Sequence, residues 1–258
     1  MTTRPVILVT GAAKRLGRAI ALELAGHGFD VAVHYRSSAQ DAQATVVDLQ
    51  ALGASAHAFE ADLSDEAACR ALVPAVVARF ERLDGVVNNA SLFVEDSVQT
   101  FSYAEMDRHW RSNTGPAVLL AQALHRHLDG CAEVGCVVNL LDQKLWNPNP
   151  DYFSYTLSKA ALQAATLMLA QSLAPQLRVC GVAPGVTLPS DSMSASVFDA
   201  AHRMTPLRRS SMPIDIARAV RFLLESPAIT GSTLLVDGGQ HLAAQARDVL
   251  YLAKNESH

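Results

Sequence analysis

Short apolar runs alternate with amphipathic segments of helical length along almost the whole chain, and this alternation most constrains the fold. The runs that suit buried parallel strands span residues 6–9, 31–34, 56–59, 85–87, 135–141, 179–182 and 234–236. Segments of helical length lie between them, such as residues 15–26, 40–52, 65–80, 103–128 and 153–174. Strands separated by helices pair in parallel. The sequence therefore predicts an α/β fold, with a doubly wound, seven-stranded parallel sheet and helices on both faces.

The alternation continues through the 258 residues without a linker, a repeat or a low-complexity segment. Half of the residues are apolar and 18% are charged, which is enough apolar material for one large core. We therefore expect a single domain over residues 1–258. The net charge of −4 and the lack of a basic run make nucleic acid and anionic membranes poor candidate partners.

The first residues lead directly into an apolar run that is too short for a signal peptide or a membrane span. The four cysteines, Cys69, Cys131, Cys136 and Cys180, have no metal-ligand spacing and lie in apolar contexts. Reduced cysteines in the core are typical of a cytoplasmic protein, so we expect a cytoplasmic protein without a bound metal.

The turn between the first strand and the first helix carries a cofactor signal. Gly11 and Gly17 let the backbone approach a pyrophosphate, while the helix N-terminus supplies N–H donors and a positive dipole. Arg15 stands where a middle glycine is expected, and an arginine there can pair with a phosphate. A helix-start turn that binds no ligand is the alternative at this point.

The end of the second strand indicates which nucleotide the turn would bind. Enzymes that use NAD usually place an acidic side chain there, to hold the 2′-hydroxyl of the ribose. This chain has Tyr35, Arg36 and Ser37 instead, and no acid before Asp41. Because arginine and serine form charge-assisted hydrogen bonds with a 2′-phosphate, the pattern favours NADP(H).

Polar residues also follow the third and fourth strands. Asp62 and Leu63 come after the third strand, where a carboxylate and backbone groups can meet an adenine edge. Asn-Asn-Ala at residues 88–90 ends the fourth strand, and for Asn88 we favour a purely structural role. Asn113, in the long segment that follows, can hold a proton-relaying water or can bond the backbone.

Tyr155 and Lys159 are four residues apart, on one face of an expected helix. An ammonium close to a phenol lowers the pKa of the phenol, so this pair can exchange protons near neutral pH. Asp142 stands thirteen residues before Tyr155, where many oxidoreductases with this pair have a serine. The carboxylate is consistent with a specialised substrate or with a lost activity.

Together these motifs resemble the short-chain dehydrogenase/reductase superfamily, in order and spacing, from about residue 5 to residue 241. The matching motifs are Thr10-Gly11 with Gly17, Asn88-Asn89-Ala90, Asn113, Tyr155-x-x-x-Lys159, Pro184-Gly185 and Asp237-Gly238-Gly239. The resemblance implies a Rossmann-type domain, commonly a homotetramer. It also implies that Tyr155 protonates the substrate, Lys159 binds the nicotinamide ribose and Asn113 supports the proton relay.

The same resemblance assigns the cofactor contacts and a mobile substrate loop at residues 187–212, and leaves the tail at residues 241–258 without a role. The implied cofactor contacts are Gly11, Arg15, Leu16, Gly17, Tyr35, Arg36, Ser37, Asp62, Leu63, Asn89, Ala90, Ser91, Tyr155, Lys159, Pro184, Gly185, Val186 and Thr187.

Several departures from the general superfamily pattern are similar to the pteridine reductases. These are the arginine in the glycine turn, Asn-Asn-Ala-Ser-x-Phe at residues 88–93, and aspartate in place of serine. The resemblance implies that Phe93 stacks a pterin against the nicotinamide and that Asp142 works with Tyr155. The implied substrate contacts are Arg15, Ser91, Phe93, Asp142, Tyr155 and Leu188.

The chemistry of reduction favours the same substrate. Reducing a ketone builds negative charge on oxygen, which an ionised Asp142 would oppose. Reducing the C=N bond of a dihydropterin protonates nitrogen, and a carboxylate stabilises the positive character while a carboxylic acid can donate a proton. We therefore expect NADPH-dependent reduction of a dihydropterin such as dihydromonapterin or dihydrobiopterin, or of dihydrofolate. The alternatives are a carbonyl reductase for a 3-oxoacyl, sugar or small ketone substrate, and a non-catalytic NADP(H) sensor.

Overall fold

The computed structural model describes residues 4–131, 133–189 and 193–256, and its centre is a parallel sheet. The strands are β1 (Val6–Val9), β2 (Asp30–Tyr35), β3 (Ala56–Glu60), β4 (Gly85–Asn88), β5 (Gly135–Leu140), β6 (Leu177–Pro184) and β7 (Thr233–Val236). They lie in the order β3-β2-β1-β4-β5-β6-β7, and every neighbouring pair is parallel. The predicted fold class is confirmed, and a strand is present at each predicted run.

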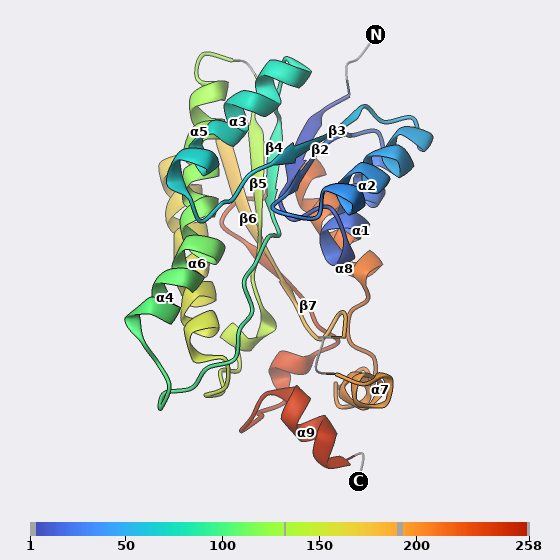
Figure 1. Ribbon diagram of the computed structural model, residues 1–258, viewed down its shortest axis with the longest axis vertical. Coiled ribbons are helices and arrows are strands. Elements are labelled where there is room, and N and C mark those ends of the chain that lie inside the picture. Colours follow the sequence, from blue (N-terminus) through green and yellow to red (C-terminus); the bar gives the residue numbers. More distant parts are fainter. Residues whose placement is uncertain (1–3, 132, 190–192, 257–258) are drawn as a thin grey trace.

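Helices cover both faces of the sheet (Figure 1). One face carries α1 (Arg15–Gly26), α2 (Ala39–Ala51) and α8 (Pro213–Glu225), and the other carries α3 (Glu66–Phe80), α5 (Gly115–Leu128) and α6 (Phe153–Ser172). Each face has its own apolar core, in which leucines such as Leu24 and Leu120 are fully buried. Burying one such side chain contributes about 1.5–3 kcal/mol. The sheet is therefore held rigidly, and its carboxyl edge is a firm base for a site.

The prediction of one long helix over residues 103–128 is wrong in one respect, because the structure divides this segment into two helices joined by a turn. α4 (Tyr103–His109) leads into a π-helical turn at Trp110–Thr114, and α5 begins at Gly115. Pro116 lies in the first turn of α5 and has no N–H to donate to a carbonyl one turn earlier. The regular hydrogen-bond ladder therefore cannot run through this point, and the wider turn that results carries Asn113.

The predicted substrate loop and tail both contain helices. α7 (Ala195–Arg203) lies within the loop, and α9 (Val249–Glu256) lies within the tail. The two helices pack together through a small apolar cluster that includes Val197 and Leu250 (Figure 1). Residues 190–192 of the loop and 257–258 of the tail lie outside the described residues.

The cysteines follow the prediction with one exception. Cys69, Cys136 and Cys180 are buried, whereas Cys131 is exposed. The predicted burial of Cys131 is wrong because α5 ends at Leu128, and the following turn carries the chain out to the surface. Along the described part of the chain, no helix has both the length and the apolar character that a bilayer span requires.

Candidate active site

Two adjoining cavities open at the carboxyl ends of the central strands, where β1 lies between β2 and β4. One has a volume of about 440 Å³ and is lined by the turn after β1; we name it the Gly11 cavity. The other has a volume of about 290 Å³ and is lined by Tyr155 and Lys159; we name it the Tyr155 cavity. They share the lining residues Arg15, Leu16, Asn89 and Ser91. Ligands of open α/β sheets bind at this kind of topological switch point.

The glycines of the first turn are required by close packing. Gly11 has a φ of +63°, a conformation that glycine adopts without steric cost. A Cβ at Gly17 would lie 2.2 Å from the Gly11 carbonyl oxygen and 2.6 Å from Nδ2 of Asn89. That amide donates to the carbonyls of Thr10 and Gly11, at 2.9 and 3.3 Å. The turn is thereby locked to the end of β4, with its backbone facing the Gly11 cavity.

Arg15 has a backbone conformation that favours glycine, the residue expected at this position of the turn. Its φ is +54°, in the left-handed region that costs a non-glycine residue about 1–2 kcal/mol. Its Nη2 donates to the carbonyl of Pro189 at 2.7 Å, and the residue lines both cavities. Arg15 therefore connects the first turn with the segment that follows β6, at some cost in backbone energy.

His34 is a site residue that the sequence reasoning missed. The N–H of Gly11 donates to its Nδ1 at 3.0 Å, and its Nε2 lies 3.0 Å from the Ala61 carbonyl. Burial lowers the pKa of His34, and the neutral ring accepts at Nδ1 and donates at Nε2. The imidazole thus bridges the turns after β1 and β3. A histidine inside an apolar strand gives no signal of such a role in one sequence.

The residues expected to select the nucleotide divide into two groups. Arg36, Asp62 and Leu63 line the Gly11 cavity, together with Lys14 and Ser64, which were not predicted. Asp62 accepts hydrogen bonds from Oγ and N of Ser64 at 2.7 and 2.9 Å, and these hydrogen bonds lower the pKa of its carboxyl.

The side chains of Tyr35 and Ser37 line neither cavity. The Tyr35 hydroxyl donates to Oε2 of Glu60 on β3 at 3.3 Å, because alternate residues of a strand face opposite sides of the sheet. The side chains of Tyr35 and Ser37 are therefore not placed where the predicted cofactor contacts would require them.

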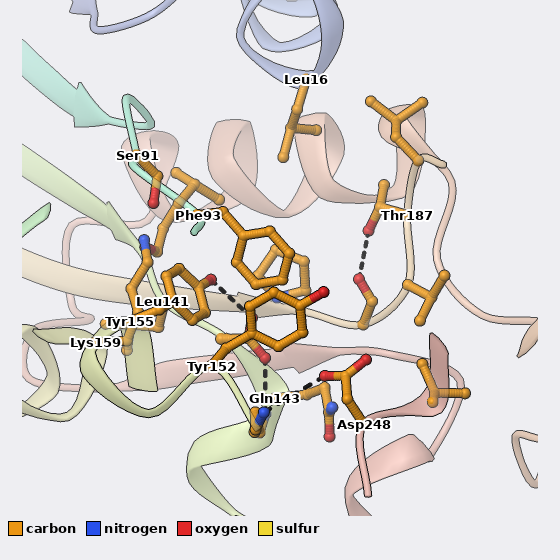
Figure 2. Close-up of a pocket in the computed structure, with 18 of the residues that line it drawn as sticks. Leu16, Ser91, Phe93, Leu141, Gln143, Tyr152, Tyr155, Lys159, Thr187 and Asp248 are labelled. Carbon is orange, nitrogen blue, oxygen red and sulfur yellow. Dashed lines mark hydrogen bonds and ion pairs between the residues drawn. The ribbon is translucent and has the colours of Figure 1, made fainter. Parts of the chain in front are cut away.

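Tyr155 and Lys159 lie close together in the Tyr155 cavity (Figure 2), and Asp142 lines the same cavity. The Tyr155 hydroxyl donates to Oδ2 of Asp142 at 2.8 Å. Nζ of Lys159 donates to the Leu140 carbonyl at 2.7 Å and lies 5.8 Å from the centroid of the Tyr155 ring. Asp142 lies two residues after the end of β5 and Tyr155 lies in the first turn of α6, so the ends of two elements set this geometry.

The electrostatics of this group differ from the prediction. Burial, followed by the charge and hydrogen bond of Asp142, holds the pKa of Tyr155 well above its usual value. The expected lowering of that pKa by Lys159 is therefore wrong, because a carboxylate next to the phenol opposes its ionisation. Burial also raises the pKa of Asp142 and lowers the pKa of Lys159 to about 8.

Asn113 holds the loop after β4 against α6. Its Oδ1 accepts from the N–H of Leu92 at 2.6 Å, and its Nδ2 donates to Oγ of Ser158 at 2.9 Å and to the Leu92 carbonyl at 3.0 Å. It lines neither cavity. Of the two predicted uses of this amide, these contacts match hydrogen bonding to the backbone. Asn88 is likewise engaged with the sheet, since it donates to Asn139 at 2.8 Å.

Aromatic rings form one wall of the Tyr155 cavity. Phe93 stacks on Tyr152 with a centroid distance of 4.1 Å, and its ring meets Tyr155 edge-on at 4.7 Å (Figure 2). Phe93 is 47% exposed, which is high for a large apolar side chain in a well-packed fold. Tyr152 has a φ of +53°, another left-handed residue at the site. An exposed ring over a cavity offers a surface on which a flat ligand can stack.

The last residue of β6 and the segment that follows it close the cavity from the side of the predicted substrate loop. Its lining residues are Pro184, Gly185, Val186, Thr187 and Leu188. The Thr187 hydroxyl lies 2.7 Å from Oγ of Ser211, which ties the beginning of the loop to its end (Figure 2).

A further set of lining residues was not predicted from the sequence. It consists of Gln143, Lys144, Tyr152, Met193, Gln240, Asp248, Val249 and Leu250. Most of them belong to the tail or to the loop between β5 and α6. No local motif marks these residues, because they reach the cavity through contacts between distant segments.

Comparisons with known proteins show that this chain has relatives among the reductases. A family model described as "Enoyl-(Acyl carrier protein) reductase" matches residues 11–241. The chain is 34% identical to pteridine reductase 1 of Leishmania tarentolae over 93% of this chain and 97% of that protein. It is 33% identical to the 3-oxoacyl-(acyl-carrier-protein) reductase FabG of Staphylococcus aureus over 91% and 97%. A crystal structure of FolM alternative dihydrofolate reductase 1 from Brucella canis with NADP is 41% identical, covers 96% of this chain and 98% of its own, and has a TM-score of 0.90.

Proposed function

This chain belongs to the short-chain dehydrogenase/reductase superfamily, and we propose that it uses NADPH to reduce dihydropterins to tetrahydropterins. Its relatives include a pteridine reductase and a solved alternative dihydrofolate reductase. The single observation that carries the proposal is the 2.8 Å hydrogen bond from the Tyr155 hydroxyl to the Asp142 carboxyl.

The Gly11 cavity has the chemistry that NADP(H) requires. Its turn presents backbone N–H groups where glycines permit a close approach, and Lys14, Arg15 and Arg36 supply positive charge. We assign the 2′-phosphate to Arg36 and Lys14, and the nicotinamide end to Tyr155, Lys159 and the residues after β6. When bound there, the reduced nicotinamide supplies a hydride.

The protein's own part of the reaction is the delivery of a proton. Tyr155 stays neutral because its pKa is raised, so it can donate its hydroxyl proton to a substrate nitrogen. Asp142 is then the next proton source, because its raised pKa favours the protonated carboxyl more than in an ordinary aspartate. A C=N bond thus gains a hydride at carbon and the Tyr155 proton at nitrogen, and the Asp142 proton then passes to the Tyr155 phenolate along the 2.8 Å contact.

Lys159 stabilises the charge that this transfer creates. Its ammonium is held by the Leu140 carbonyl, close to the Tyr155 ring. As the phenol loses its proton, the positive charge of the ammonium lowers the energy of the phenolate. Phe93 would stack on the flat pterin, and such stacking contributes about 0.5–1.5 kcal/mol beyond burial.

Ketone reduction is the second candidate, since the S. aureus relative is named as a 3-oxoacyl reductase. The Tyr155–Lys159 pair would serve that reaction as well. A ketone, however, develops negative charge on its oxygen, and the ionised form of Asp142 opposes this charge. An imine nitrogen that gains a proton becomes more positive, so the ionised form of Asp142 does not oppose that change.

The test is a comparison of initial rates of NADPH oxidation with a 7,8-dihydropterin and with a panel of ketones that includes a 3-oxoacyl thioester. We expect turnover of the dihydropterin and little turnover of the ketones. Asp142→Ser should lower the rate on the dihydropterin and should keep or raise any rate on ketones. Efficient ketone reduction without pterin turnover by the wild-type protein would contradict the proposal.

A further inference from the structure

The C-terminal tail supplies a wall of the Tyr155 cavity. Asp248, Val249 and Leu250 line it, and Asp248 lies beside Tyr152 and Gln143 in Figure 2. These residues are more than eighty positions from Tyr155 in the chain. A tail that carries a charged side chain into a reaction cavity requires an explanation, because burying a charge is costly unless it meets a partner.

Several contacts hold the tail in this position. Nε of Arg247 donates to Oδ2 of Asp151 at 2.8 Å, and the N–H of Asp248 donates to the same oxygen at 2.7 Å. The Tyr251 hydroxyl donates to the carboxylate of Glu95. Since Asp151 lies two residues before the start of α6, the tail is attached close to the first turn of the helix that carries Tyr155.

The wall is rich in hydrogen-bond acceptors. Oδ1 of Asp248 accepts from the N–H of Leu250 at 3.1 Å, and Oδ2 lies 3.4 Å from Nζ of Lys144. A carboxylate can accept about four hydrogen bonds, so Asp248 has capacity that these contacts leave unused. Next to it, Oε1 of Gln143 is buried and has no hydrogen-bond partner among the described residues. The Asp248 carboxylate and Oε1 of Gln143 can therefore both accept hydrogen bonds from donors on a ligand.

Charges of both signs line the Tyr155 cavity. Its acidic side chains are Asp142 and Asp248, and its cationic side chains, among the described residues, are Arg15, Lys144 and Lys159. Lys144 also donates to the Asp151 carbonyl. A substituent placed directly against the Asp248 carboxylate is repelled if it is anionic, whereas a neutral hydroxyl group can donate a hydrogen bond to it.

We propose that Asp248 determines specificity by accepting hydrogen bonds from hydroxyl groups on the C6 substituent of the substrate. The cavity thereby selects a dihydropterin with a neutral, polyhydroxylated side chain over one with an apolar or an anionic side chain. This inference rests on the proposed pterin reductase function.

The test compares three substrates that share the 7,8-dihydropterin ring: one with a trihydroxypropyl group at C6, one with a methyl group, and dihydrofolate. The readout is the ratio of kcat/KM values, measured for the wild type and for Asp248→Ala and Asp248→Asn. We expect the wild type to prefer the hydroxylated substrate, and Asp248→Ala to lower that preference about tenfold, as expected for a hydrogen bond to a charged group. Asp248→Asn keeps a side chain that can cap α9, and should lower the preference less.

Glu95→Gln is the matched control. It removes one negative charge near the tail and keeps an acceptor for Tyr251, but Glu95 does not line the cavity. The ratio should therefore stay at its wild-type value. The inference is overturned if Asp248→Ala slows the hydroxylated and methyl substrates equally, or if Glu95→Gln changes the ratio as much. Absence of turnover with all three substrates in the wild type would instead overturn the proposed function itself, and the inference with it.

Discussion

The Gly11 cavity and the Tyr155 cavity share an edge, but the chain builds them differently. The lining of the Gly11 cavity comes from residues 11–112, which form consecutive strand–helix units at the switch point of the sheet. The lining of the Tyr155 cavity comes from residues 15–250, including the tail. The Gly11 cavity thus depends on local turns, and the Tyr155 cavity depends on contacts between distant segments. The two halves should therefore respond separately to substitution.

Tyr155→Phe should produce the largest separation between the two cavities. Without the hydroxyl, the proton donor is lost, and we expect kcat on a dihydropterin to fall about a thousandfold. The Kd for NADPH, measured by fluorescence titration, should change little, since the Gly11 cavity is untouched. A large loss of NADPH binding would show that the two cavities are coupled.

Gly17→Ala should damage the Gly11 cavity first. The new Cβ would overlap the Gly11 carbonyl oxygen, which is backbone and cannot easily move. We expect a loss of unfolding free energy of about 1–3 kcal/mol in urea denaturation, together with weaker NADPH binding. Gly26→Ala, at the end of the same helix, is the control. Nothing lies within 4 Å of its added Cβ, so it should stabilise the helix by about 0.5–1 kcal/mol.

Asp142→Asn should change the Tyr155 cavity alone, and most clearly in its pH dependence. In the wild type, kcat/KM for a dihydropterin should fall as pH rises through the raised pKa of Asp142, because the protonated carboxyl is the second proton source. In the variant, this decrease with pH should be absent, and the rate should be about tenfold lower than in the wild type. In the wild type, the loss of the Lys159 charge should add a decrease near pH 8, and in the variant this decrease should move to lower pH, because the charge of Asp142 raises the pKa of Lys159. An unchanged pH profile would remove Asp142 from the proton relay.

Arg36→Ala should have the smallest effect, confined to the choice of nucleotide. Loss of its charge should raise KM for NADPH about tenfold, as one charge-assisted hydrogen bond would, and should leave KM for NADH unchanged. Tyr35→Phe is the control, because Tyr35 faces Glu60 and lines neither cavity. An equal effect on both nucleotides would place Arg36 outside the 2′-phosphate site.

The same contrast explains how much could be predicted from the sequence. The strands and the Gly11 turn were predictable because periodicity and glycine spacing report local backbone requirements. The division of residues 103–128 depends on Pro116 and on the packing of the loop after β4, which periodicity does not report. His34 was missed because its role lies in contacts with two neighbouring turns.

The Tyr155 cavity was predictable only where motifs mark it. Tyr155, Lys159 and Asp142 were identified by spacing, and the structure brings them together. The direction of the Tyr155 pKa shift could not be predicted from the sequence, since it depends on burial and on the partner of the hydroxyl. Asp248 was unpredictable because the contacts that place it, to Asp151 and Lys144, span about one hundred residues of chain.

The left-handed backbone at Arg15 has a consequence for anyone who engineers this protein. Glycine would relax that conformation, so Arg15→Gly is a substitution that a stability-guided redesign would select. The same change would remove the one cationic side chain, among the described residues, that lines both cavities. A more thermostable variant obtained at this position would thus lack a charge of the wild-type cavities, and its ligand binding would not represent that of the natural protein.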